Sequence, residues 1–174
     1  STPANERAAR SRLGLLTGNA ALARNEAGRA IEALDEAQSE AIGAGDTKLA
    51  GEIAIDRARA LVILGREADA AGALAQARNQ VPDNPQGWLL SATLSRRQGR
   101  LVDAQTQIQR AAELLPVDPE IGLEAGVIAA LSGRDEAARK SFRSVIAAAP
   151  GSLPAKTAQS YLDQLGPEAP SPAR

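Results

Sequence analysis

The chain contains no cysteine, no histidine and no methionine. Without cysteine or histidine it lacks the ligands of the usual zinc sites and the residues of Cys-His and Ser-His-Asp catalysis. Calcium-loop and phosphate-loop patterns are absent as well. Carboxylates are common, but they alternate with arginine and glutamine as solubilising charges of helices do. We therefore expect no metal, no cofactor and no enzymatic activity.

Large side chains and excess charge are also scarce. Aromatic residues make up 2% of the chain although 44% of it is hydrophobic, so alanine supplies much of the apolar count. Alanine buries little area, and such a core must form from many close helix contacts. The net charge of -1 argues against binding to nucleic acid or an anionic membrane surface. No apolar run reaches the ~18 residues of a membrane span, so we expect no direct membrane insertion.

A sequence repeat is present instead. The glycines of three Gly-Arg pairs, Gly65, Gly99 and Gly133, lie at equal intervals, and an alanine follows each glycine five residues later. Proline recurs at the same interval, at Pro82, Pro116 and Pro150. A fixed period of this length, about 34 residues, is typical of a helix-turn-helix array.

A further copy of the second-helix pattern lies upstream, at residues 25–37. Its alanine, Ala30, precedes Ala70 by six positions more than the repeat period, so six additional residues are expected between this helix and the next. Gly43 and Gly45 are predicted to break the helix in that stretch, and Asp46 is predicted to cap the helix that follows.

The most complete copy carries, in order, Trp88, Ala92, Gly99, Ala104, Ile108, Ala111 and Pro116. This series resembles the tetratricopeptide repeat, in which tryptophan, small residues, a turn glycine and a closing proline recur. Gly122 and Ala54 stand where the tryptophan is expected, and Ala54 predicts weaker local packing. The resemblance implies an all-α fold, a right-handed α-solenoid of about four helix-turn-helix repeats with a C-terminal capping helix.

The boundaries follow from the repeat register and from capping signals. Asn84-Pro85, Asp118-Pro119 and Ser152 are predicted to begin helices. We expect a disordered N-terminus at 1–4, a first repeat with an extended hairpin at 5–50, a second repeat at 51–84, a third at 85–118, a fourth at 119–151, a capping helix at 152–165, and a disordered proline-rich tail at 166–174.

In the family, the first helix of each hairpin lines a concave groove. Carried over by position, the resemblance implies a peptide-binding groove formed by Leu15, Asn19, Ile55, Arg59, Val62, Leu89, Thr93, Arg96, Arg97, Leu123 and Val127. Leucine or isoleucine at 15, 55, 89 and 123 would anchor apolar side chains, and the arginines would meet carboxylates. The alternative is that these residues pack against neighbouring hairpins, against the protein's own terminus or against a second copy. Trp88, Phe142 and Tyr161 are expected in the core.

The expected function is a non-catalytic scaffold that binds another protein or a peptide, in bacterial cell-envelope assembly. A self-assembling, homo-oligomeric module is the alternative. A co-chaperone-like adaptor is a minor one, because Leu15 and Asp56 replace the lysine and an asparagine of the family's carboxylate clamp, and only Asn19 matches. The missing initiator methionine leads us to expect a processed form or excised piece, with a periplasmic or membrane-anchored location favoured over the cytoplasm.

Overall fold

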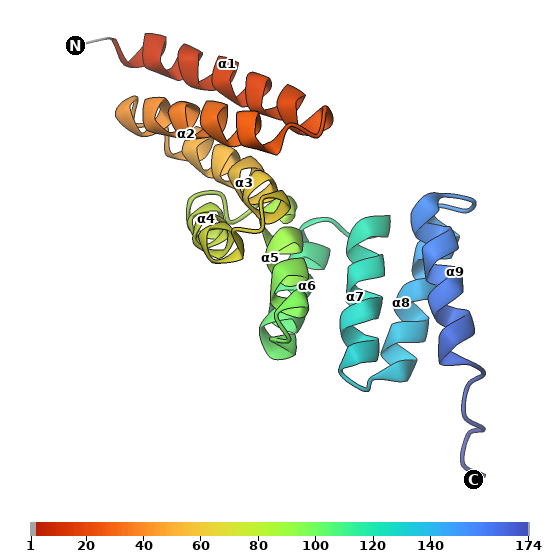
Figure 1. Ribbon diagram of the computed structural model, residues 1–174. Coiled ribbons are helices and arrows are strands. Elements are labelled where there is room, and N and C mark those ends of the chain that lie inside the picture. The colour runs from red at the N-terminus through yellow and green to blue at the C-terminus, as the bar shows by residue number, and fades with distance from the viewer. Residues whose placement is uncertain (1–2, 174) are drawn as a thin grey trace. The chain divides into compact units, whose positions relative to one another are not determined.

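The computed structural model describes residues 3–173, and over these residues it contains nine α-helices and no strand (Figure 1). The fold is therefore an all-α helical repeat array, as the sequence predicts. The helices are α1 (Ala4–Ala23), α2 (Ala27–Gly43), α3 (Thr47–Ile63), α4 (Glu67–Gln80), α5 (Pro85–Arg97), α6 (Leu101–Leu114), α7 (Pro119–Leu131), α8 (Asp135–Ala148) and α9 (Leu153–Leu165). They form two compact units, of which the N-terminal one ends at Ser91 and the C-terminal one begins at Ala92.

Three-residue turns connect the helices within each hairpin, and a residue with positive φ lies at the centre of each turn. The central residue is glycine in three of the hairpins, with φ near 74° at Gly65 and Gly133, and it is Asn25, with φ 60°, in the first. Glycine adopts this backbone conformation without the clash that a Cβ would introduce. The Gly-Arg pairs of the sequence therefore mark the hairpin turns.

The six additional residues of the first repeat lie in helices and not in a longer loop. Helices α2 and α3 each have 17 residues, against 14 for α4 and 13 for α5. The connection between α2 and α3 is a short turn centred on Gly45, with φ 72°. Gly43 is the last residue of α2, and the Asp46 side chain caps α3 by accepting from the Leu49 amide at 3.0 Å, as predicted. Because α3 begins at Thr47, residue 50 lies inside a helix.

Two other predicted caps are present at the starts of α7 and α9. The Asp118 side chain accepts a hydrogen bond from the Ile121 amide at 3.0 Å, and the Ser152 hydroxyl accepts one from Ala155 at 3.2 Å. These bonds satisfy amide groups that have no partner inside the helix. Both helices therefore begin where the sequence places a capping side chain.

In the N-terminal unit, helices approach closely because glycine faces larger residues. Helix α1 packs against α2 and α3, and α3 packs against α4 (Figure 1). A Cβ added to Gly18 would lie 2.5 Å from Leu34 Cδ2, and one added to Gly14 would lie 2.8 Å from the Ala37 Cβ. Only glycine leaves room for α2 at these two points.

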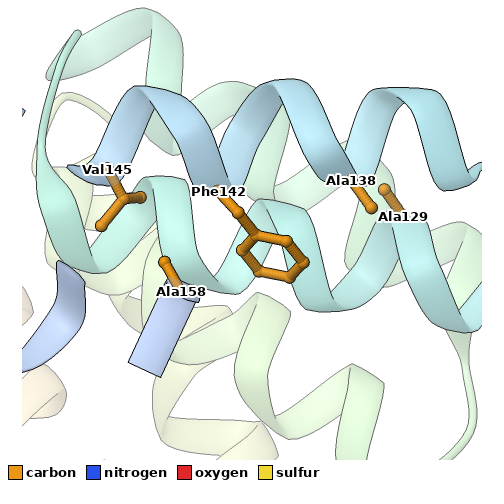
Figure 2. Packing of buried hydrophobic residues seen from close by; sticks show 5 residues of the cluster. All are labelled: Ala129, Ala138, Phe142, Val145 and Ala158. Atoms are coloured by element: carbon orange, nitrogen blue, oxygen red, sulfur yellow. The ribbon is translucent and has the colours of Figure 1, made fainter. Parts of the chain in front are cut away.

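In the C-terminal unit, the same kind of close contact accommodates an aromatic ring. Helix α7 packs against α6, α8 and α9. Phe142 and Val145 point from α8 toward α7, with Ala158 of α9 nearby (Figure 2). A Cβ on Gly126 would overlap the Phe142 ring, and one on Gly122 would lie 2.7 Å from Val145 Cγ2. Val145 thus fills the space at the position where the most complete repeat has tryptophan.

The ends of the chain are described in part. Residues 1, 2 and 174 lie outside the described residues, so the predicted disorder at these positions is not tested; Ala4 is already helical. Residues 166–173 contain no helix or strand. Within them, Glu168 forms an ion pair with Arg143 of α8, with 2.6 Å between Oε1 and Nη2.

Candidate peptide-binding surface

The groove residues predicted in the N-terminal unit lie on α1, α3 and the start of α5, and they differ in exposure. Asn19 is exposed, and Leu15 and Val62 are half-buried. Ile55 and Leu89 are buried, with exposed fractions of 3% and 7%. Their side chains therefore offer little surface to a ligand in this structure.

Ile55 has a packing role in the N-terminal unit. It belongs to a buried cluster with Ala54, Ala77 and Val81, and Leu90 packs against this cluster. The contacts join α3 to the end of α4 and to α5. This is the alternative that the sequence left open, in which a residue of the apolar row packs against neighbouring helices.

Arg59 connects two first helices by hydrogen bonds. Its Nη1 donates to the Asp56 carboxylate on the same helix, and its Nη2 donates to Gln86 Oε1 at the start of α5, at 3.1 Å. Asp56 occupies the position where the family's carboxylate clamp has an asparagine. An acid already paired with Arg59 would repel a ligand carboxylate there.

Arg96 has the same role in the C-terminal unit. Its Nε and Nη2 donate to the two carboxylate oxygens of Glu124, at 2.5 and 3.4 Å, and so connect α5 to α7. This fork geometry is the strong form of an arginine–carboxylate pair. Of its neighbours on α5, Arg97 is exposed and Thr93 is half-buried.

Leu123 and Val127, the predicted groove residues of α7, are half-buried and pack against the cluster around Phe142. Beside Val127 lies an open apolar hollow of about 290 Å³, which we call the α7–α9 hollow. Its lining residues are Val127, Ala130, Leu131, Phe142, Tyr161, Gln164 and Leu165. Leu131 is 57% exposed at its rim.

The α9 residues of this hollow are not among the predicted groove residues, because the sequence predicts only a capping role for α9. The register contains the signal: α9 spans Leu153–Leu165, and each of its ends lies one full repeat period after the matching end of α7, Pro119–Leu131. Helix α9 is thus the first helix of a further, incomplete repeat. Leu165 stands one period after Leu131.

The aromatic residues have packing contacts, and Trp88 also has polar ones. Phe142 is 1% exposed, and its ring stacks on that of Tyr161 with 5.4 Å between centroids. Trp88 is half-buried; its Nε1 donates to the Pro82 carbonyl at 2.8 Å, and the Arg78 guanidinium lies 5.8 Å from the ring centroid. Such a cation–π contact helps to fix the ring.

Among residues 3–173, no group of three or more acidic side chains is placed to hold a metal ion. None of the helices that the structure describes is both long and apolar enough to cross a membrane. The described chain is thus an α-helical repeat array whose C-terminal unit carries an open apolar hollow on its first helices.

The family is shown by its sequence pattern. The model of the tetratricopeptide repeat family matches residues 55–119 and again residues 89–152, together more than half of the chain. The chain therefore belongs to the tetratricopeptide repeat family. Its fold is that of a protein–protein interaction scaffold, and members are generally non-catalytic.

Solved structures of other proteins have a similar fold. Pseudomonas aeruginosa PilF is 15% identical with a TM-score of 0.73, over 87% of this chain and 67% of that one. YrrB, a tetratricopeptide protein with an unusual peptide-binding site, is 18% identical with a TM-score of 0.58, over 84% and 90%. The first such domain of Spaghetti (RPAP3), bound to an HSP90 peptide, is 16% identical with a TM-score of 0.61, over 66% and 90%. No curated protein matches the chain.

Proposed function

We propose that this protein is a non-catalytic scaffold that binds a peptide or a partner protein on its first helices, with the main anchor in the α7–α9 hollow. The observation that carries the proposal is the hollow itself, an open apolar depression beside Val127 with the exposed Leu131 at its rim. An apolar depression of this kind, with a few polar groups at its edge, is what binding sites have in common.

The hollow suits one large apolar side chain. Covering a leucine or phenylalanine side chain contributes about 1.5–3 kcal/mol, and the rim leucine would gain from being covered as well. Gln164, the polar residue of the lining, offers an amide donor and an acceptor for a peptide backbone. The preferred ligand is therefore an extended or helical segment that presents a leucine, isoleucine or phenylalanine.

The other predicted groove residues have supporting roles in this proposal. Thr93 and Arg97 on α5, and Leu123 on α7, would contact the ligand next to its anchor. Leu15, Asn19 and Val62, which the structure leaves exposed or half-buried, would contact a ligand of the N-terminal unit. Arg59 and Arg96 would position the first helices by their bonds to Asp56, Gln86 and Glu124.

Peptide selection from a random library tests this proposal. Leu131→Glu places a charge at the rim of the hollow, and the exposed position keeps its effect on stability small, within about 0.5 kcal/mol. Val102→Glu on α6 is the matched control, because Val102 is 83% exposed and does not line the hollow. The wild type and the control should enrich the same peptides with a large apolar residue, and Leu131→Glu should lose them. Equal enrichment by all three proteins would contradict the assignment.

We propose bacterial cell-envelope assembly as the setting, prompted by the tetratricopeptide proteins of pilus and polysaccharide export that the repeats resemble. Fractionation of the source cells, followed by detection of the protein with an antibody, tests this setting. Recovery with the periplasm or the envelope would support it, and recovery only with the cytosol would contradict it.

Self-association is the second candidate function, and one surface favours it. Leu13 and Leu16 of α1 are 65% and 67% exposed, so an apolar strip lies uncovered on the first helix. Sedimentation over a wide range of concentrations distinguishes the candidates. Dimers that Leu13→Glu abolishes would support self-association, whereas a monomer at all concentrations would remove this candidate.

A further inference from the structure

A second, larger depression lies on the C-terminal unit. We call it the α8–α9 hollow; its volume is about 730 Å³. It is lined by Arg139, Arg143, Ile146, Ala147, Gln159, Leu162, Asp163, Gly166, Pro167 and Glu168. It shares no lining residue with the α7–α9 hollow. The proposed peptide anchor therefore does not account for it.

Arg139 in this lining is buried with incomplete hydrogen bonding. Its side chain is 7% exposed, and its Nη1 donates to Glu136 Oε1 at 2.8 Å. Nη2 makes two long bonds, each 3.4 Å, to the carbonyls of Leu165 and Pro167. Nε is buried and has no hydrogen-bond partner. A buried donor without an acceptor is unfavourable, so the Nε/Nη2 edge of this guanidinium lacks the acceptor that it needs.

The same edge of another arginine shows which acceptor fits. In this unit, Arg96 uses Nε and Nη2 to bind both carboxylate oxygens of Glu124. A carboxylate matches the two parallel donors of a guanidinium edge, and the pair is stronger than a bond to a neutral carbonyl. By this comparison, a carboxylate is the acceptor that the edge of Arg139 lacks.

The chain's own tail already places such groups at the rim. After α9 ends at Leu165, Pro167 directs its carbonyl to Arg139, and the Glu168 carboxylate lies 2.6 Å from Arg143 Nη2. This Pro-Glu segment is not helical. It shows how an extended acidic segment can meet both arginines, although Glu168 pairs only with the outer, exposed one.

An extended occupant fits this hollow better than a helix would. In the preceding repeat, Gly122 and Gly126 of α7 make room for the second helix. One period later, α9 carries Lys156 and Ser160, both exposed. The preceding repeats have only Ala54 or Trp88, Ala58 or Ala92, and glycine at these two positions, so the polar Lys156 and Ser160 do not offer the apolar surface that a second helix packs against. The prolines of the tail also prevent a helix after α9.

We propose that the α8–α9 hollow is a second binding site, which takes an extended acidic segment of a partner protein. The partner's carboxylate is held by the Nε/Nη2 edge of Arg139 with support from Arg143, and Ile146 and Leu162 contact its apolar neighbours. Asp163 and Glu168 are the acids of the lining, and displacement of Glu168 leaves Arg143 without its ion-pair partner and open to the incoming carboxylate. Glu168 is thus an internal competitor for the site.

The test uses the full chain and a blocked peptide, acetyl-Gly-Pro-Glu-Ala-Pro-amide, which copies residues 166–170. The peptide is titrated while the side-chain Nε–H signals of Arg139 and Arg143 are followed by NMR. The control peptide has glutamine in place of glutamate. The acidic peptide should shift both arginine signals and the control should not. Shifts with both peptides, or with neither up to the solubility limit, would overturn the proposal.

Variants give a second, independent readout. Glu168→Gln removes the competitor from an exposed ion pair, which should lower the Kd of the acidic peptide by up to about fivefold. Arg143→Gln should raise it. Leu131→Glu in the α7–α9 hollow should leave the Kd of the acidic peptide unchanged. The result for this site is therefore independent of the result for the proposed peptide anchor. An unchanged Kd in Glu168→Gln, or loss of peptide binding in Leu131→Glu, would contradict the assignment. Arg139→Lys should also raise the Kd, because an ammonium group cannot form the two parallel bonds of a guanidinium edge. Both arginine variants are checked by circular dichroism, and if Arg139→Lys loses helix content, Glu168→Gln still decides the question.

Discussion

The two units fill equivalent positions of the repeat with side chains of different size. In the N-terminal unit Gly18 faces Leu34, and in the C-terminal unit Gly126 faces Phe142. The middle repeats have alanine at the glycine position, and Leu74 or Ile108 at the position of the larger side chain, all buried. The comparison indicates that the repeat fixes the combined volume of the two facing side chains, whereas the size of each one varies between repeats.

The units also differ in what holds neighbouring helices together. In the N-terminal unit, buried polar groups assist: the Ser11 hydroxyl donates to the Ala37 carbonyl at 2.8 Å, and Gln38 Nε2 donates to the Ala50 carbonyl at 3.1 Å. The C-terminal unit has a bond of this kind from the Ser95 hydroxyl to Gln107 Oε1 at 2.7 Å, and it adds the stack of Phe142 on Tyr161, beside which the α7–α9 hollow lies open.

The largest expected effect comes from removing the aromatic side chain. Phe142→Ala should lower the free energy of unfolding by about 3–5 kcal/mol, because it leaves a cavity between α7, α8 and α9. Leu34→Ala is the matched change in the N-terminal unit, with about 2–5 kcal/mol. Urea denaturation measures both values, and native-state hydrogen exchange locates them.

If stability is a sum of neighbour terms, Phe142→Ala should weaken protection mainly in α7–α9, and Leu34→Ala mainly in α1–α3. Loss of protection over every helix in both variants would show a single cooperative core instead.

A smaller effect is expected from filling the space at the glycine. Gly126→Ala should destabilise by about 1–3 kcal/mol, because the new Cβ overlaps the buried Phe142 ring. Adding Phe142→Ile recreates the alanine–isoleucine pair of the third repeat and should recover part of the loss. A double-mutant cycle measures this coupling. Strictly additive changes in the free energy of unfolding would show that the two side chains do not share one space.

The hairpin turns should respond alike in the two units. Gly65→Ala and Gly133→Ala each place a Cβ at a positive φ, and each should destabilise by about 1–2 kcal/mol. Thermal melts of the two variants check this. A much larger effect in one unit would show that its turn has a role besides chain reversal.

The smallest change is expected to stabilise. Gly72 lies inside α4 with nothing within 4 Å of an added Cβ, so Gly72→Ala should raise stability by up to about 1 kcal/mol through helix propensity. Gly14→Ala on α1 is the contrasting variant, because its Cβ would meet Ala37. Destabilisation by Gly72→Ala in a melting experiment would contradict the open surroundings of that position.

The sequence predicts the period, the helix starts and the class of fold, because turn glycines, caps and proline are local signals. Exposure depends on tertiary neighbours, and so the burial of Ile55 against α4 does not follow from its position on a first helix. Predicting the α7–α9 hollow requires Tyr161 and Leu165 of α9 to be aligned with α7 by the repeat period. The prolines after α9 obscure this alignment, because no second helix follows to complete the repeat. The unsatisfied Nε of Arg139 has no sequence signal at all.

The most direct test of the account is a methyl NMR titration with a peptide selected on the wild-type protein. The methyl signals of Val127, Leu131 and Leu165 should shift, and these shifts should vanish in Leu131→Glu but persist in Val102→Glu. Shifts confined to methyl groups of the N-terminal unit, or shifts that Leu131→Glu leaves intact, would contradict it.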